Sequence, residues 1–327
     1  MFDNDPRDQD TRDRDDGIRD REGDCHVLGR VPGSALAHAD GTDREPREGD
    51  RDARDRENDR GSIDPRDVFS RDLDLPSGPD RELVHHRDRN YRLNGSDART
   101  LSTVGAFRVV SERDLREPRD AAFDVRDRDL RHLEKQGLIE RVPLDGRERA
   151  VALTDRGRCL LEGRRERDTE HRQQFHSGAD RPRERTHDAE IYRAYLKAAE
   201  GLRNQDSRIL RVALDRELKR DYQRFLQERN RGDRDSDGRP DRTVEEIQEW
   251  ARQHDLPYFD DQVHFPDVRI EYEDANGDVR WEDIEVTTEH YRGAHGAAAS
   301  RSGFSIHTTG RSGRGASFDP RVAEEFL

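Results

Sequence analysis

The stretch from residue 124 to residue 162 decides the fold, and it reads DVRDRDLRHLEKQGLIERVPLDGRERAVALTDRGRCLLE. Leu130 and Leu133 have the spacing of one face of a helix, and Gly137 is a typical residue just past a helix end. Alternating apolar residues beyond the glycine predict two short strands. These strands are Ile139 to Val142 and Ala150 to Leu153. The order therefore predicts a short helix followed by a strand pair.

The residues between and after these strands complete the pattern. Asp145 and Gly146 favour the positive φ angles of a tight hairpin, and Thr154 is a typical N-cap for a further helix. Upstream, helices are expected from Ser96 through Phe107 and from Ser111, which would give a three-helix core. The whole unit resembles a winged helix-turn-helix, and its Thr-Asp-Arg-Gly helix start resembles the one that follows the wing in MarR-like regulators.

The resemblance implies contact with duplex DNA. A helix fits the major groove, and guanidinium groups bind phosphates or guanine edges, while a wing reaches the neighbouring backbone. Residues 96–167 hold 17 Lys and Arg against 15 Asp and Glu, in a chain of formal net charge -14. The alternative is a protein-binding module whose helix arginines are a solvated face. The candidate DNA-binding residues are Arg126, Arg128, Arg131, His132, Lys135, Arg147 and Arg149.

Composition predicts that part of the chain does not fold. Only 29% of the 327 residues are hydrophobic and 42% are charged, which departs from ordinary globular composition. Residues 1–62 consist largely of Asp/Arg strings without apolar periodicity, so they cannot bury enough surface to offset chain entropy. No signal peptide or membrane-spanning run is found, which predicts a cytoplasmic protein without membrane contact.

The predicted fold class is α+β, with several domains. The expected divisions are a disordered Asp/Arg-rich tail at 1–62, a winged-helix domain at 63–168, a charged linker at 169–183, an α/β domain at 184–310, and a C-terminal tail at 311–327.

The last of these folded regions is inferred from its order of elements. A helix stripe at 189–199 precedes a strand candidate at 208–214, and a helix at 217–229 follows. Asn276-Gly277 then joins two further strands, before a small-residue helix and a last strand at 304–307. This order is similar to the restriction-endonuclease-like nuclease fold. It resembles in particular the replication-relaxation proteins of bacterial plasmids, which couple a winged helix to such a domain.

That resemblance implies a Mg²⁺ site. Asp267 and Glu285 match the two acidic positions of the motif, and Glu190 matches a helix carboxylate sometimes added to the site; all three would be metal ligands. Thr287 stands where the fold has a catalytic lysine and cannot supply its charge, so the resemblance implies a degenerate nuclease unless Lys219 or Arg292 substitutes. The alternative is an exposed acidic hairpin, because residues 241–289 hold 16 acidic and 4 basic residues.

The function expected from these resemblances is DNA binding by a protein of a bacterial mobile element, acting in plasmid replication, DNA relaxation or transfer. Two alternatives stay open, a Mg²⁺-dependent nuclease using Asp267 and Glu285, and a MarR-like transcriptional regulator. The expected partners are duplex DNA, relaxase or replication proteins, and a second copy of the chain.

Overall fold

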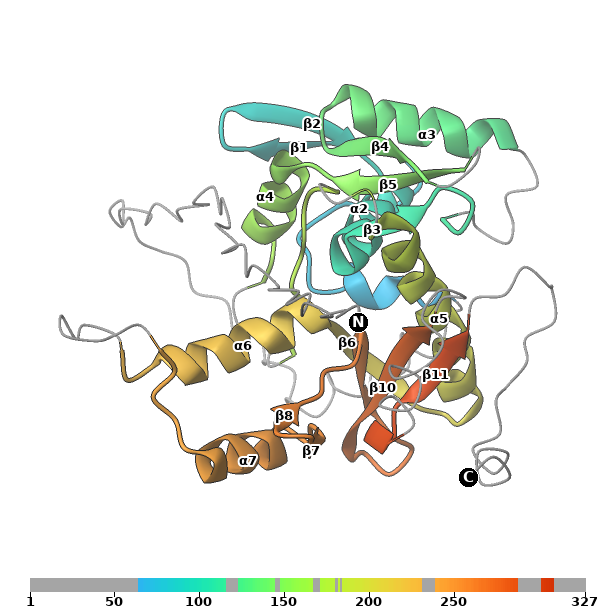
Figure 1. Cartoon of the computed structure of the whole chain (residues 1–327). Coiled ribbons are helices and arrows are strands. Elements are labelled where there is room, and N and C mark those ends of the chain that lie inside the picture. Colours follow the sequence, from blue (N-terminus) through green and yellow to red (C-terminus); the bar gives the residue numbers. More distant parts are fainter. Residues whose placement is uncertain are drawn as a thin grey trace, which may run out of the picture. The chain divides into compact units, whose positions relative to one another are not determined.

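The computed structural model describes residues 64–115, 123–144, 148–166, 171–179, 182, 184–230, 239–287 and 301–308 (Figure 1). All of them belong to one compact unit, which spans Ala37–Leu327. The predicted tails at 1–62 and 311–327 lie outside the described residues. In the described part the protein is a mixed α+β structure, as the sequence predicts at this level.

The first half of the described chain builds two small sheets and three helices. Its elements are η1 (Asp67–Phe69), β1 (Glu82–His86), β2 (Arg89–Leu93), α2 (Gly95–Phe107), β3 (Val109–Ser111), α3 (Phe123–Lys135), β4 (Ile139–Pro143), β5 (Arg149–Leu153) and α4 (Asp155–Gly163). Strands β1 and β2 form an antiparallel pair, and a three-stranded sheet has the order β3-β5-β4.

The second half supplies the remaining described elements. They are α5 (Arg185–Asn204), β6 (Arg208–Leu214), α6 (Asp215–Gln227), α7 (Val244–Gln253), β7 (Tyr258–Phe259), β8 (Gln262–Val263), β9 (Val268–Glu273), β10 (Val279–Thr287) and β11 (Ser305–Thr308). A four-stranded sheet has the order β11-β10-β9-β6. Strand β9 is antiparallel to both neighbours, whereas β10 and β11 are parallel. The small-residue helix expected between these two lies outside the described residues.

Helix ends follow the capping chemistry of the sequence. The Thr154 hydroxyl accepts a hydrogen bond from Gly157 N at 3.1 Å, which confirms the predicted cap of α4. Only glycine fits at position 157, because a Cβ atom there would lie 2.1 Å from the Leu138 carbonyl oxygen. Helix α2 begins at Gly95, slightly before the predicted start at Ser96, because Asn94 is its N-cap and forms a capping box with Asp97.

The helix predicted from Ser111 is wrong, because this residue ends strand β3. Arg108 has a φ of 63°, which stops α2. Val109 and Val110 then extend and pair antiparallel with β5, with both side chains buried. Two consecutive β-branched residues favour this extended, fully buried conformation over a helix.

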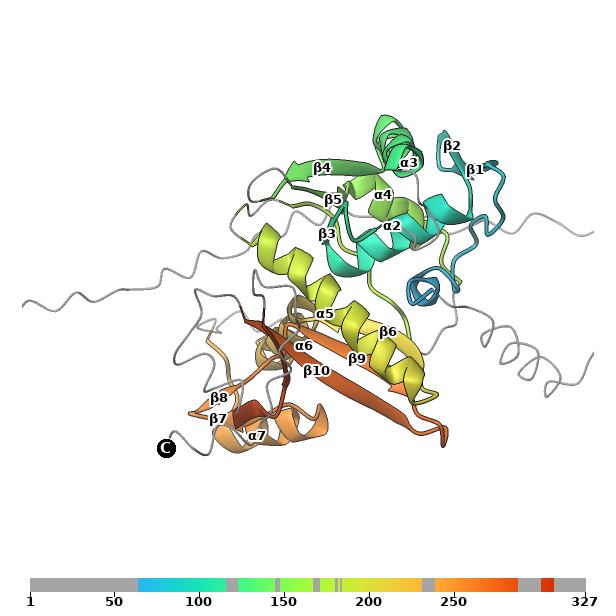
Figure 2. The same cartoon turned by 90° about the vertical axis from the view of Figure 1, so that its right-hand side faces the viewer.

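Helix α5 packs on one face of the four-stranded sheet and against α2 (Figure 2). Alternate residues of the sheet, such as Val212, Val268 and Ile284, belong to the same buried apolar cluster as Tyr192 and Tyr195 of α5. The cluster continues into α2, β5 and α4, so one core joins the two halves of the described chain. A smaller cluster centres on Trp250 between α6, α7 and the β7–β8 pair.

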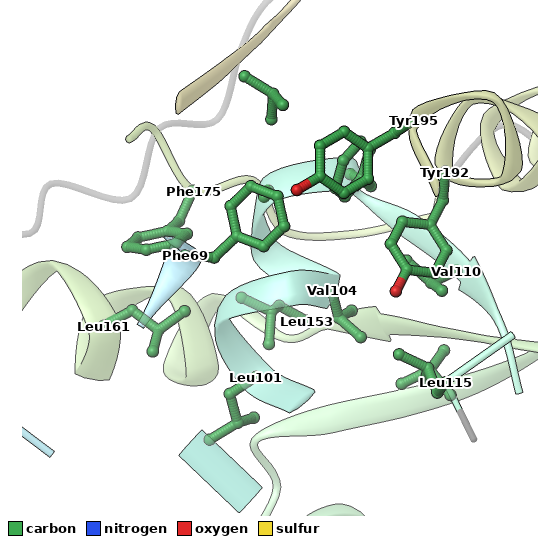
Figure 3. Packing of buried hydrophobic residues seen from close by; sticks show 14 of the residues in the cluster. Phe69, Leu101, Val104, Val110, Leu115, Leu153, Leu161, Phe175, Tyr192 and Tyr195 are labelled. Atoms are coloured by element: carbon green, nitrogen blue, oxygen red, sulfur yellow. The ribbon is translucent and has the colours of Figure 1, made fainter. Parts of the chain in front are cut away.

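An aromatic group lies where α2, η1 and α5 meet (Figure 3). The ring of Phe107 is 5.0 Å from the rings of both Tyr192 and Tyr195, and the Phe69 ring is 5.4 Å from those of Phe107 and Tyr195. The Tyr195 hydroxyl donates to the carbonyl oxygen of Pro65 at 2.6 Å, so its polar end is satisfied.

We expect Phe107→Ala to lower the free energy of unfolding by about 3–5 kcal/mol, because it removes a fully buried ring and leaves a cavity. Leu83→Ala is the matched control, since Leu83 is 67% exposed, and its effect should stay within about 0.5 kcal/mol. Urea unfolding followed by circular dichroism measures both. Equal effects of the two substitutions would contradict the role given to the aromatic group.

Candidate functional site

The outer face of α3 carries a line of basic side chains. Arg128, Arg131 and Lys135 are exposed and stand three and seven residues apart, so they share one side of the helix. Leu130 and Leu133 are buried on the opposite side. The side chain of Arg131 is 65% exposed and lies 2.6 Å from the Asp127 carboxylate. We call Arg128, Arg131 and Lys135 the α3 stripe.

The other candidate DNA contacts divide into three groups. Arg149 is exposed at the start of β5, on the hairpin that follows α3. The His132 ring is partly buried, and its Nε2 lies 2.9 Å from the Arg92 carbonyl oxygen, so it packs α3 against β2. The side chain of Arg126 and all of Arg147 lie outside the described residues.

Three carboxylates lie in one row at the end of the four-stranded sheet. Leu214 of β6 and Ile284 of β10 both pair with Val268 of β9. The next residue outward on each strand is acidic, namely Asp215, Asp267 and Glu285. The backbone N–H of Asp215 donates to the Asp267 carbonyl oxygen at 3.1 Å, which holds the first two side by side. We call these three residues the carboxylate row.

Asp267 is the most constrained member of this row. Its Oδ2 accepts a hydrogen bond from Val286 N at 2.7 Å and lies 3.2 Å from Nε2 of His187, in the first turn of α5. Burial disfavours a charged His187, but the carboxylates of Asp188 and Asp267 outweigh it and raise the pKa of the imidazole to about 10. His187 is therefore an internal cation beside the row.

Glu285 has the most perturbed carboxyl group of the row. Burial and the nearby charge of Asp267 raise its pKa to about 7, while His187 and Lys219 act in the opposite direction. Lys219 is exposed on α6 and its Nζ lies 2.8 Å from the Asp215 carboxylate. A lysine thus lies near the carboxylates, although it comes from α6 and not from β10. Arg292 lies outside the described residues.

The structure does not bring all the candidate metal ligands together. Glu190 is hydrogen bonded by Arg193, near Asp114, and neither Asp267 nor Glu285 is among the charges that act on it. The Thr287 hydroxyl lies 3.2 Å from that of Thr308 on β11. Within the described ranges, no group of three or more His, Cys, Asp or Glu side chains is arranged to hold a metal ion.

Sequence reasoning missed His187 and Asp215. Asp215 comes directly after a predicted strand, as Asp267 comes directly before one, so a signal for the row was present in the sequence. His187 precedes the helix stripe and carries no motif. Its role depends on α5 crossing the sheet end, which is a tertiary contact.

Comparison with known proteins adds no relative to this picture. No family model matches the chain, and no significant match was found to a curated protein or to a solved structure. In the parts of the chain that the structure describes, no helix has the length and apolar character needed to cross a membrane.

The two perturbed groups predict two pH windows of stability. The folded pKa of Glu285 is about 7 against an ordinary 4.5, so its ionisation costs stability, which falls as pH rises from about 4.5 to 7. The folded pKa of His187 is about 10 against an ordinary 6.5, so its contribution is complete below about pH 6.5 and is lost as pH rises to about 10.

We therefore expect Glu285→Gln to reduce the pH dependence of the unfolding free energy between about pH 4.5 and 7. His187→Gln should reduce it between about pH 6.5 and 10. Urea unfolding at pH values from 4.5 to 10 measures the slope in each window. Glu200→Gln, an exposed position on α5, is the control and should leave both slopes unchanged. If either variant changed the slope only in the pH range assigned to the other residue, the assignment would be contradicted.

Proposed function

We propose that this protein binds duplex DNA through α3 and the β4–β5 hairpin. The observation that carries the proposal is the α3 stripe, three exposed cations on one side of a helix that precedes the hairpin. The order of helix and hairpin, with the sheet order β3-β5-β4, supports the winged-helix interpretation. Arg149 at the hairpin adds a fourth exposed cation.

The stripe fits a polyanion because its charges are spaced along the helix and face away from the core. Such a helix enters a major groove while the hairpin reaches the adjacent backbone. The overall charge of -14 opposes nonspecific coating of DNA. Binding should therefore occur at this one face. A role in replication, relaxation or transfer of a mobile element, with relaxase or replication proteins as partners, belongs to the same proposal.

Replacing Arg128, Arg131 and Lys135 together with alanine should weaken binding to a duplex and lower the slope of log K against log salt by roughly 2 to 3, because up to three phosphate contacts are lost. Fluorescence anisotropy over a salt series measures both quantities.

The matched control removes the same charge from other helices. Arg203, Arg224 and Arg252 are exposed on α5, α6 and α7, and their triple alanine variant should retain the salt slope of the parent protein. If the stripe variant is folded and its slope is unchanged, α3 is not the DNA-contacting helix. Equal losses in both variants would indicate a general charge effect.

A second candidate function is metal-dependent cleavage of a phosphodiester bond. It is favoured by the carboxylate row, since Asp267 immediately precedes β9, Glu285 lies on the adjacent strand β10, and burial together with the charge of Asp267 raises the pKa of Glu285. A divalent cation such as Mg²⁺ would relieve this repulsion and bind phosphate oxygens. The carboxylate that completes this pair at the sheet end is Asp215 and not Glu190.

We expect weak nicking of supercoiled DNA by the wild type with Mn²⁺, because Thr287 provides no charge beside the metal. Thr287→Lys should raise the rate, by up to about a hundredfold, the usual value of one electrostatic partner in the transition state. The added substitution Asp267→Ala should abolish this gain. Gln205→Lys, at an exposed position after α5, is the control and should not reproduce it.

Strong wild-type nicking that is lost in Asp267→Ala would contradict the degenerate reading and direct attention to Lys219. No nicking by any variant, together with intact duplex binding, would favour the regulator alternative. In that case the second half of the chain would bind a partner or a second copy of the chain.

A further inference from the structure

A basic cluster surrounds His176, outside the α3 stripe and the carboxylate row. The backbone N–H of His176 donates to the Gly105 carbonyl oxygen of α2 at 2.8 Å, and that of Gly178 donates to the Leu153 carbonyl oxygen, next to α4, at 2.8 Å. Two residues before His176, the side-chain oxygen of Gln174 accepts a hydrogen bond from Arg220 of α6. The segment 171–179 therefore brings three helices to one place.

Each of these helices contributes arginine. Arg108 follows the last residue of α2, Arg158 lies on α4, and Arg216 and Arg220 lie one turn apart on α6, so they share a helix face. All four are close enough to act on His176. Together with burial, which is the larger cause, they lower the pKa of its imidazole to about 3.

Several nitrogen atoms of this cluster lack a partner. His176 Nε2, Arg108 Nε and Arg158 Nε are shielded from solvent and have no hydrogen-bonding partner among the described residues. Buried donors in folded proteins are almost always satisfied, and an unsatisfied group often marks the place of a bound ion or water. The three nitrogen atoms come from three different segments, which fits one shared ligand between them.

Two carboxylates of the described residues lie near the cluster. Asp188 lies 3.2 Å from a terminal nitrogen of Arg108, and the Ser177 hydroxyl donates to Asp155 at 2.7 Å. The Asp188 carboxylate is shared, because it also acts on His187. A bound anion would be attracted by the guanidinium groups around His176.

We propose that Arg108, Arg158, Arg220 and His176 form a binding site for a phosphate group. Guanidinium groups offer rigid, paired N–H donors that match the geometry of phosphate oxygens. A neutral imidazole adds one N–H donor when the proton is on Nε2. The ligand chemistry is a phosphate oxyanion, carried by a nucleic-acid backbone or by free phosphate. The site does not depend on the DNA-binding face proposed for α3.

Isothermal titration of the full chain with inorganic phosphate at pH 7, against sodium chloride of equal ionic strength, tests the site. We expect saturable binding to the wild type and an affinity at least tenfold lower for Arg158→Gln. Arg156→Gln is the matched control, because Arg156 lies exposed on the same helix, and it should bind as the wild type does. Phosphate should also raise the thermal midpoint of the wild type.

The imidazole of His176 gives a second measurement that requires no variant. Phosphate should shift its nitrogen resonances and raise its pKa, because an anion stabilises the protonated ring. Absence of binding heat together with unmoved His176 resonances would overturn the proposal, as would unchanged affinity in a folded Arg158→Gln variant. Competition by a dinucleotide phosphodiester would identify the ligand as nucleic-acid backbone, whereas binding of inorganic phosphate alone would identify free phosphate.

Discussion

The packing of α5 against α2 is the interaction on which the rest of the described structure depends. Phe107 at the end of α2 contacts Tyr192 and Tyr195 of α5, and Phe69 closes the same group from η1. Helix α5 also packs against β6, β9 and β10 of the four-stranded sheet. One helix thus provides core to both halves. In a chain with only 29% hydrophobic residues, sharing one core is how each half buries enough apolar surface.

The same helix fixes the charges at its first turn. Arg108, after the end of α2, forms an ion pair with Asp188. The preceding residue, His187, lies within hydrogen-bonding distance of Asp267 at the sheet end. Charges of alternating sign therefore run from the basic cluster around His176 to the carboxylate row. Each group is stabilised by its neighbour of opposite sign, so removal of one would leave another partly buried and unpaired.

Local chemistry in the sequence was sufficient to predict most elements. Thr154 caps a helix as expected, β6 spans the predicted strand, and Gly277 has the positive φ of 86° that its turn requires. Strand β3 was missed because its conformation comes from pairing with β5, which lies forty residues away in the chain. A short polar-capped segment such as Ser111 to Leu115 fits a helix until its partner is known.

The residues of the candidate site also divide into those found from the sequence and those that depend on tertiary contacts. Asp267 and Glu285 were assigned from the resemblance to a nuclease motif, and the antiparallel pairing of β9 with β10 places them on neighbouring strands. His187, Lys219 and the arginines around His176 lie on elements that meet only in three dimensions. A chain rich in arginine also gives no sequence signal that separates an arginine in a cluster from one on a solvated face.

Opposite charge at the two candidate sites imposes a condition on any DNA that contacts both. The α3 stripe attracts phosphate by itself, and its binding weakens with salt because each phosphate that it neutralises releases a counterion to solution. The carboxylate row carries acidic groups of its own, so phosphate contact there would be favoured by a bound divalent cation. Contact at α3 should therefore depend on ionic strength alone, whereas contact at the row should also depend on a divalent ion. A chelator and a monovalent salt thus act on different steps, and their effects separate binding at α3 from chemistry at the sheet end.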